Sequence, residues 1–428
     1  MRLANVLRAY RQAKRLRFDS RAALEHHQQR QLRQFISTQL TRSPWFAPYI
    51  DQPLHTWPVM TKATMMEHFD RINTAGLKLA DVLTCAWEAE RTRDFTKTVD
   101  GYSVGLSSGT SGSRGVFVVS AAEQARWAGV MLARVLPRGL FAGERVALFL
   151  RANNNLYSAV RNPCLSFEFF DLMQPFAQHF ERLARYAPTI IVGPAQVLRA
   201  LAEAKLHRQI DIHPRLVISG AEVLTPFDRE FLARAFESVG EVYQATEGFL
   251  GSTCAHGTLH LNESHVHFEP QWLDERRFVP IVTDFTRTTQ PIVRYRLDDI
   301  LVKHATPCAC GSHEMAIAHI EGRCDDFLRL PGRDGVAMEI YADSISRSLA
   351  QVLPISADYR LAQIGKTQLS LCVEGVNDAE LANCRAHLEH FLSNQGVQTE
   401  QLVWTLNSHL PAADFGTKRR RITRQKEA

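Results

Sequence analysis

A short stretch rich in glycine and hydroxyl side chains, 106-LSSGTSGSRGVFVVS-120, holds the first residues of this sequence whose types and spacing could do chemistry. Glycines let the backbone turn its N–H groups toward an anion, and serine and threonine hydroxyls add further donors. The stretch has neither the Gly-Lys-Ser/Thr ending of a Walker loop nor a G-x-G-x-x-G fingerprint. It could therefore bind phosphate, and a solvated turn between two strands is the alternative interpretation. The residues concerned are Ser107, Ser108, Gly109, Thr110, Ser111, Gly112 and Gly115.

Cysteine and histidine recur at short spacing in two other places, 254-CAHGTLH-260 and 307-PCACG-311. Thiolates and imidazoles are the ligands that tetrahedral zinc takes in closed structural sites. The single residue between Cys308 and Cys310 is tighter than the usual gap of two, so spacing alone indicates zinc only weakly. Buried thiols packed as small apolar groups are the alternative. Rivals for the histidine ligand are His256 and His313, and His265 and His267 are further histidines nearby.

The composition is that of an ordinary globular protein, because 45% of the 428 residues are hydrophobic and 22% are charged. No apolar run approaches the ~20 residues of a membrane helix, and the N-terminus lacks the apolar region of a secretory signal. Eight cysteines in a chain of this length fit a cytoplasmic, reducing setting. The net charge of +5 is gathered at the two ends of the chain, which argues against a nucleic-acid partner.

Between Val146 and Ala245, short β-rich runs alternate with stretches of helical periodicity. This alternation predicts an α/β fold with a parallel sheet covered by helices on both faces. One helix is expected over 226-PFDREFLARAFES-238, with Thr225 as its N-cap and Pro226 as its first residue. The expected strands are 146-VALFL-150, 189-TIIVG-193, 215-RLVISG-220 and 241-EVYQA-245.

The chain divides into regions of different character. Residues 1–70 are helical and basic and are expected to pack on the large domain, whose core is 71–324. The turn cluster 331-PGRDG-335 leads into a second α/β stretch, so we place a boundary near Asp325 and a small domain over 325–428. Within it we expect strands at 368-QLSLCVEG-375 and 400-EQLVWTL-406, and an amphipathic helix at 377-NDAELANCRAHLEHFLSN-394.

Four more short stretches follow the glycine-rich loop along the chain: 243-YQATE-247, 294-RYRLDDI-300, 322-GRCDDFLRLPG-332 and 416-GTKRRRI-422. Together with the loop, this ordered series resembles the adenylate-forming (acyl-CoA synthetase) superfamily, and within it the phenylacetate–CoA ligase-like branch. That branch shows S-S-G-T-T-G, Y-G-x-[ST]-E, R-Y-R-T-G-D, G-R-x-D-D and a lysine near the C-terminus. The stretch 57-WPVMTKATMMEHF-69 resembles the branch's P-x-x-T-K segment, and the resemblance runs from about Arg33 to the end.

The resemblance implies a large N-terminal domain with parallel-rich sheets flanked by helices, and a small mobile C-terminal α/β domain that turns about Asp325 as hinge. It implies ATP-dependent activation of a carboxylic acid to an acyl-adenylate, followed by transfer to a thiol. A free carboxylate is a poor electrophile, and coupling it to AMP supplies the leaving group.

The resemblance also assigns roles within the nucleotide site. The loop would hold the β- and γ-phosphates, Glu247 would hold Mg²⁺, Thr246 would contact the α-phosphate and Asp299 would accept hydrogen bonds from the ribose hydroxyls. Plain surface carboxylates are the alternative for Glu247 and Asp299. The implied nucleotide-binding residues are Ser107, Ser108, Gly109, Thr110, Ser111, Gly112, Gly115, Gly220, Ala221, Glu222, Tyr243, Gln244, Thr246, Asp299 and Arg323.

Three residues carry the implied catalysis: Glu247, Arg323 and Lys418, the last of which would neutralise charge as the carboxylate attacks the α-phosphorus. The sequence departs from the branch in several places. Lys418 stands one residue later than the lysine of close relatives, and a solvated basic tail is its alternative reading. The other departures are Ser113-Arg114-Gly115 in the loop, Gln244 in place of glycine, and Leu297-Asp298 in place of Thr-Gly.

Members of the same branch carry a cysteine and a G-x-H element after Y-G-x-T-E, and C-x-C-G before G-R-x-D-D. By that resemblance one structural zinc would be held by Cys254, His260, Cys308 and Cys310. Such a metal would tie the strand after Tyr243 to the strand that precedes Arg323.

The substrate is implied only as a small-molecule carboxylic acid, of aryl or medium acyl type. A pocket lined by Phe167, Phe169, Phe170, Tyr243 and Phe249 would favour such an acid, and a plain hydrophobic core is the alternative. Coenzyme A and an acyl carrier protein are both open as acceptors, and a homodimer is open as the assembly. Two rival functions are a ligase with a non-thiol acceptor and a catalytically silent, zinc-stapled binding protein.

Overall fold

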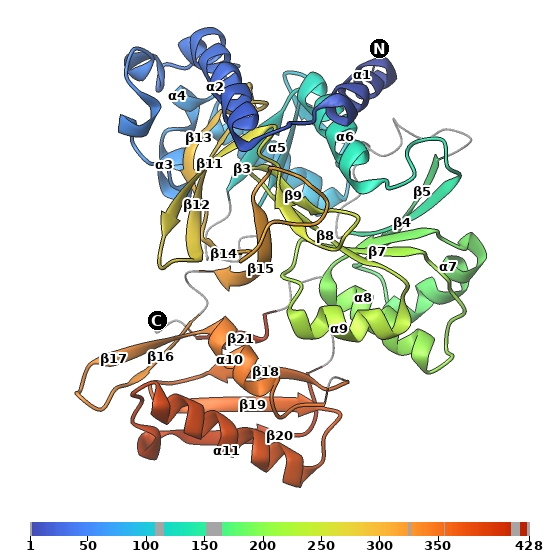
Figure 1. Cartoon of the computed structure of the whole chain (residues 1–428), viewed down its shortest axis with the longest axis vertical. Coiled ribbons are helices and arrows are strands. Elements are labelled where there is room, and N and C mark those ends of the chain that lie inside the picture. Colours follow the sequence, from blue (N-terminus) through green and yellow to red (C-terminus); the bar gives the residue numbers. More distant parts are fainter. Residues whose placement is uncertain are drawn as a thin grey trace.

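The computed structural model describes residues 2–107, 115–150, 165–323, 327–354, 356–411 and 420–425. The chain forms a large body up to Arg323 and a smaller body from Phe327 onward (Figure 1). None of the described helices is long and apolar enough to cross a membrane.

The large body is built on a sheet that has twelve strands within the described residues. One half runs in the order β8-β7-β6-β4-β5 with every pair parallel, as the alternation of strands and helices predicts. These strands are β4 (Glu144–Leu150), β5 (Leu165–Asp171), β6 (Ile190–Gly193), β7 (Leu216–Gly220) and β8 (Val239–Ala245).

Beyond β8 the sheet continues with antiparallel pairs in the order β9-β10-β15-β14-β12-β11, and β13 also pairs with β12. Strand β8 therefore has a parallel neighbour on one edge and an antiparallel neighbour on the other. The bounds are β9 (Gly248–Thr253), β10 (Leu259–Leu261), β11 (Val266–Trp272), β12 (Arg277–Asp284), β13 (Ile292–Arg296), β14 (Asp299–Lys303) and β15 (Ala316–Arg323).

Helices cover both faces of the parallel half, as predicted. Along β4, Ala147 and Phe149 pack with α8 and α9, while Val146 and Leu148 pack with α6. This alternation with a period of two is what a strand buried on both faces requires. The helices are α6 (Ala121–Val135), α7 (Phe180–Tyr186), α8 (Ala195–Leu206) and α9 (Pro226–Ala235), with the short helix η5 (Phe176–His179) before α7.

Helix α9 begins as its sequence predicts. The Thr225 hydroxyl accepts a hydrogen bond from the backbone N–H of Asp228 at 3.1 Å, and Pro226 is the first helical residue. A proline is tolerated there because the first helical N–H has no partner within the helix.

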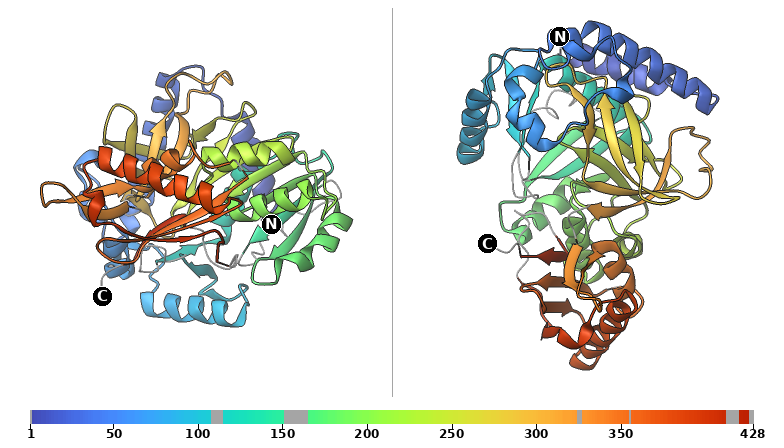
Figure 2. Two further views of the ribbon diagram at one scale, coloured as in Figure 1. Left: turned by 90° about the horizontal axis from the view of Figure 1, so that it is seen from below. Right: turned by 90° about the vertical axis from the view of Figure 1, so that its left-hand side faces the viewer.

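The N-terminal region packs on the large body through several short elements. Helix α1 crosses α6 so closely that a Cβ added at Gly129 would lie 2.5 Å from the carbonyl oxygen of Val6. Figure 2 shows α1 at the end of the molecule far from the small body. The elements are α1 (Arg2–Arg15), α2 (Arg21–Thr38), η1 (Leu40–Arg42), η2 (Ala47–Tyr49), η3 (Leu54–Thr56), α3 (Lys62–Glu67), α4 (Phe69–Ile72), α5 (Leu79–Thr92) and the three-stranded sheet β1 (Thr98–Val99), β2 (Tyr102–Leu106) and β3 (Val116–Val119).

The small body has a hydrophobic cluster of its own, in which Leu330, Leu361 and Leu388 are buried. The predicted helix is α11 (Asp378–Asn394), capped by Asn377. The strand expected from Glu400 starts only at Val403, because Thr399–Gln401 forms the short helix η6. The other elements are the hairpin β16 (Phe327–Pro331) and β17 (Ala337–Tyr341), α10 (Ala342–Leu349), and a sheet of β20 (Val403–Asn407), β19 (Gln368–Glu374), β18 (Asp358–Gln363) and β21 (Ile422–Arg424).

Buried charges join the two bodies. Arg421 Nη2 of the small body lies 2.8 Å from Asp228 Oδ1 of α9 and 3.0 Å from Asp358 Oδ1 of β18. Arg199 of α8 donates to the carbonyl oxygen of Ala357 at 2.8 Å. Burial opposes the charge on Arg421, but Asp228 and Asp358 outweigh it and raise the pKa of the guanidinium. We call Arg199, Asp228, Asp358 and Arg421 the interface cluster.

Candidate functional site

The two ends of the glycine-rich loop are fastened to each other. The backbone N–H of Ser107 donates to the carbonyl oxygen of Gly115 at 2.8 Å, and the N–H of Gly115 donates to the Ser107 hydroxyl at 2.8 Å. These bonds close the connection between β2 and β3 at its base. Residues 108–114 lie outside the described residues, and with them the candidates Ser108, Gly109, Thr110, Ser111 and Gly112.

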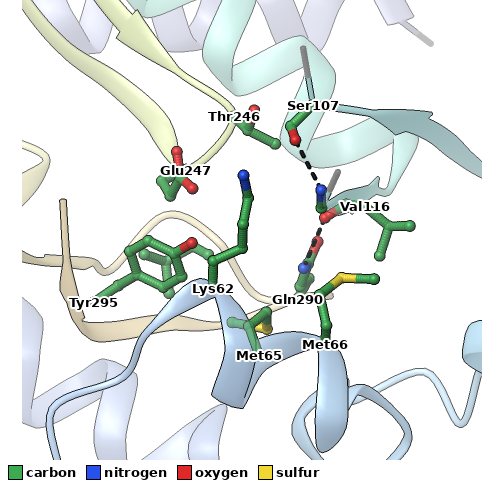
Figure 3. A pocket seen from close by; sticks show the side chains of 11 residues that line it. Lys62, Met65, Met66, Ser107, Val116, Thr246, Glu247, Gln290 and Tyr295 are labelled. Atoms are coloured by element: carbon green, nitrogen blue, oxygen red, sulfur yellow. Dashed lines mark hydrogen bonds between the residues drawn. The ribbon is translucent and has the colours of Figure 1, made fainter. Parts of the chain in front are cut away.

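Beside this base, Lys62 is brought in by a segment far away in the sequence. Met60 pairs with Tyr295 of β13, and its N–H donates to the carbonyl oxygen of Arg294 at 2.9 Å. Thr61 caps α3, so Lys62 is the first residue of that helix. In Figure 3 the Lys62 side chain rises between Glu247 and Ser107, toward Thr246. The ammonium group therefore lies at the base of the loop.

Glu247 lies in the tight turn that joins β8 to β9, next to Thr246. The two residues line a small cavity of about 20 Å³ together with Lys62, Ser107 and Tyr295. Burial raises the pKa of Glu247; the nearby Asp299 carboxylate raises it further, while Tyr295 and Lys62 oppose the shift. A carboxylate here lies beside another negative charge in a setting of low polarity, which is a reason for it to bind a cation.

Asp299 begins β14 and is held by a second predicted residue. The Tyr243 hydroxyl donates to Asp299 Oδ2 at 2.7 Å. Asp299 is also the cross-strand partner of Arg323 in the pairing of β14 with β15. Three of the residues implied to bind the nucleotide thus come from β8, β14 and β15 to one place.

A second, larger cavity of about 580 Å³ adjoins the small one, because Thr246 lines both. Ala221, Gln244 and Gly248 also line it. Gly220 ends β7, and Glu222 accepts hydrogen bonds from the backbone N–H and the side chain of Gln196 at 3.2 and 2.9 Å. These two hydrogen bonds connect Glu222 to the start of α8.

The aromatic lining of the large cavity differs from the expected one. Phe249 lies on it as expected, but Phe167, Phe169, Phe170 and Tyr243 are not among its lining residues. Phe170 faces the α8 side of the sheet and stacks on Phe149 at 4.8 Å between ring centroids, within the hydrophobic core. The aromatic residues that line the cavity are Phe95, Phe117, Trp127, Phe149 and Phe249.

The four cysteine and histidine residues that the resemblance implies as zinc ligands lie together. One ligand atom of each lies within 4.8 Å of all the others. Cys254 follows β9, His260 lies in β10, and Cys308 and Cys310 lie between β14 and β15. The Cys254 and Cys308 sulfurs are 3.7 Å apart, close to the edge of about 3.8 Å expected between two sulfurs of a tetrahedral zinc site with Zn–S of about 2.3 Å.

The surroundings of these side chains also fit a metal. The Nδ1 atom of His260 lies 3.0 Å from the carbonyl oxygen of Glu314, which leaves Nε2 as the ligand atom 3.4 Å from Cys310 Sγ. Burial opposes ionisation of Cys308, but hydrogen bonds to its sulfur, one from the Cys310 N–H, outweigh it and lower the pKa to about 6. Such a thiolate is the form that binds zinc.

Three candidates cannot be positioned further. Lys418 and the hinge residue Asp325 lie outside the described residues, and Arg323 is described only through its backbone. Conversely, Lys62 and Tyr295 belong to the site although sequence reasoning did not single them out. The sequence could have indicated them, because Lys62 lies in the stretch 57-WPVMTKATMMEHF-69 and Tyr295 lies in 294-RYRLDDI-300, and both stretches resemble motifs of the branch.

Comparison of the sequence with known proteins finds two partial relatives, and no protein-family model matches the chain. Protein CapK of Staphylococcus aureus is 27% identical over 157 residues, which is 35% of this chain and 35% of CapK. Indoleacetate–lysine synthetase of Pseudomonas savastanoi is 27% identical over 131 residues, which is 28% of this chain and 31% of that protein. The matched segments thus span about a third of each relative.

The structural similarity covers far more of the chain. The structure of 2-hydroxyisobutyryl-CoA ligase in the postadenylation state, in complex with R3-HIB-AMP, superposes with a TM-score of 0.69 and 16% identity. That match covers 94% of this chain and 89% of the ligase. The same ligase in the thioesterification state gives a TM-score of 0.54. The chain therefore has the fold of this ligase, with a large sheet and a smaller C-terminal body.

Proposed function

We propose that this protein uses ATP to convert a small carboxylic acid to its acyl-adenylate, and then passes the acyl group to a thiol. The observation that carries the proposal is the meeting of Lys62, Thr246 and Glu247 around the small cavity, with the Tyr243–Asp299 pair close enough for Asp299 to act on the pKa of Glu247. These side chains come from three separate stretches of the sequence, around Lys62, over 243–247 and at Asp299. A shared cleft with this donor set suits a nucleotide and its reaction partner.

In the proposed first step, a carboxylate oxygen of the acid attacks the α-phosphorus of ATP, a new P–O bond forms, and pyrophosphate leaves with the electrons of the broken bond. The Lys62 ammonium at the base of the loop would offset phosphate charge. Asp299, oriented by Tyr243, would accept hydrogen bonds from ribose hydroxyls. Glu247 would hold Mg²⁺, which supplies further charge neutralisation on the phosphates when bound.

Several finer assignments belong to the same proposal. Lys418 and Arg323 would act on the reacting phosphate, Asp325 would be the hinge of the small body, and residues 108–112 would bind the β- and γ-phosphates. Their support is their order along the chain and the fold, in which the base of the loop adjoins Glu247.

The acceptor thiol would be coenzyme A or the phosphopantetheine of a carrier protein. The likeness to 2-hydroxyisobutyryl-CoA ligase favours coenzyme A. An amine is the second candidate, favoured by the 27% identity to indoleacetate–lysine synthetase. Mass analysis of products formed with coenzyme A, lysine or hydroxylamine as acceptor separates the two, because the thioester and the amide differ in mass and in stability to hydroxylamine.

We also propose one structural zinc held by Cys254, His260, Cys308 and Cys310, and a cytoplasmic setting that keeps these thiols reduced. Elemental analysis of protein purified without an affinity metal should give one zinc per chain. A preparation that is folded and free of zinc would contradict this assignment.

The test of the whole proposal is exchange of labelled pyrophosphate into ATP across a broad panel of acids. At least one acid should support exchange, and Glu247→Ala should abolish it. A silent binding protein would show no exchange with any acid, and Glu247→Ala would then change stability alone.

A further inference from the structure

His265 is a residue of the large cavity that the proposed chemistry leaves unused. It lies between β10 and β11, and its side chain lines the cavity next to Asn262 and Val266. A histidine in a cavity can be a donor, an acceptor or a base, depending on which ring nitrogen carries a proton. Its hydrogen bonds decide among these roles.

The orientation of the neighbouring amide fixes the tautomer. Asn262 Nδ2 donates to the carbonyl oxygen of Phe249 at 3.0 Å, so Asn262 Oδ1 is the acceptor on the other side. Arg134 Nη2 donates to that oxygen at 3.3 Å and to Ser264 Oγ at 2.8 Å. His265 Nδ1 lies 3.1 Å from Asn262 Oδ1 and 2.9 Å from Ser264 Oγ. Both oxygens can accept, so Nδ1 carries the proton.

The imidazole is also neutral. Burial lowers the pKa of His265 to about 3, and the positive charges of Arg134 and Arg126 add to the effect while Glu314 opposes it. With the proton on Nδ1, the opposite ring nitrogen, Nε2, presents a lone pair. Among the described residues, Nε2 of His265 has no hydrogen-bond partner. So weak a base is poorly matched to proton abstraction, and its lone pair is suited to accepting a hydrogen bond.

We propose that His265 Nε2 selects acids whose acyl part carries a neutral hydrogen-bond donor, either a hydroxyl or an aryl amine. The inference rests on the proposed function and places the acid in the large cavity beside Thr246. The remaining lining fits such a ligand, because Phe117, Trp127 and Phe249 supply aromatic surface and His265 supplies the acceptor. An acid without the donor would leave Nε2 unpaired in the cavity, which lowers its affinity.

The experiment compares matched acids by ATP–pyrophosphate exchange. Benzoic and phenylacetic acids are tested beside their isomeric hydroxy and amino derivatives. In the unmodified enzyme, at least one derivative should exceed its parent in kcat/KM by about tenfold or more. In His265→Leu that ratio should fall to within about twofold, because the derivative loses more kcat/KM than the parent acid does. Hydroxy and amino derivatives that respond differently identify which donor the site takes.

Two further variants separate selection from structure. His265→Gln keeps an acceptor oxygen and should retain part of the preference, and His213→Leu, at an exposed site, should retain all of it. Equal kcat/KM for derivative and parent in the unmodified enzyme overturns the inference, whatever the variants do. Equal loss for both acids in His265→Leu also overturns it. Exchange with no acid at all refutes the proposed function itself.

Discussion

Two groups of charged side chains, the interface cluster and the group around Glu247, differ in their balance of charge. In the interface cluster two guanidinium groups face two carboxylates, and Asp228 and Asp358 raise the pKa of Arg421 against the effect of burial. Beside the small cavity, burial raises the pKa of Glu247; among the described side chains that act on this pKa, the Asp299 carboxylate raises it further and the Lys62 ammonium opposes the shift. A balanced group needs no further ion and fixes structure. An unbalanced group retains negative charge that a divalent cation would offset.

The largest effect is expected on the unbalanced side. Glu247→Gln keeps the shape of the side chain but removes its charge, so we expect ATP–pyrophosphate exchange to fall about 10²–10³-fold with little change in unfolding temperature. Glu389→Gln, at a half-buried carboxylate of α11 that pairs with Arg385, is the matched control and should leave exchange unchanged. Exchange that persists in Glu247→Gln would remove the distinction between the two groups.

The balanced side should respond in stability. Asp228→Asn leaves Arg421 and Arg199 buried without one of their carboxylates, so the free energy of unfolding should fall by about 3 kcal/mol. Urea unfolding followed by tryptophan fluorescence measures it. Asp211→Asn removes an exposed carboxylate and should cost almost nothing. If Asp228→Asn and Asp211→Asn had equal urea midpoints of unfolding, the interface cluster would not hold the two bodies together.

Glu241, a further buried carboxylate, should make the stability of the protein depend on pH. Burial raises the pKa of Glu241 to about 7 despite Arg229 at 3.2 Å. The folded state therefore binds more protons than the unfolded state above pH 4.5, and stability should fall as pH rises from about 4.5 to about 7. Glu241→Gln should remove this dependence, which amounts to about 3 kcal/mol between the two pH values. Unfolding curves with the same pH slope in both proteins would contradict it.

The smallest effect is expected at Lys62, whose ammonium group lies beside Glu247 (Figure 3). Lys62→Met should raise the KM for ATP about tenfold, because one charge contact to phosphate is lost. Lys62→Arg keeps the charge and should restore most of the affinity. A KM unchanged in Lys62→Met would place Lys62 outside the nucleotide site.

The sequence predicted the architecture well where local patterns decide it. The strands around 146-VALFL-150 and the helix capped by Thr225 follow from periodicity and capping alone. The position of Lys62 could not be predicted in that way, because it depends on the pairing of Met60 with Tyr295, two residues far apart in the chain.

The cavity lining shows the same limit. The alternation of side chains along 165-LSFEFFDL-172 predicts that neighbouring phenylalanines lie on opposite faces of the sheet. It does not predict which face borders the cavity. Phe170 packs on Phe149 in the core instead. Similarly, the spacing of cysteines and histidines left His256 and His313 as rivals of His260. Only the pairing of β10 with β9 and β15 brings Cys254, His260, Cys308 and Cys310 together.

The contact of Arg421 with Asp228 and Thr225 has a consequence for protein engineering. A chimaera that takes its C-terminal body from a protein of the same fold without an arginine at this position would lose the guanidinium but keep the buried Asp228 that faces it. Such chimaeras should therefore fold best when Thr225, Asp228 and Arg421 all come from the same parent protein.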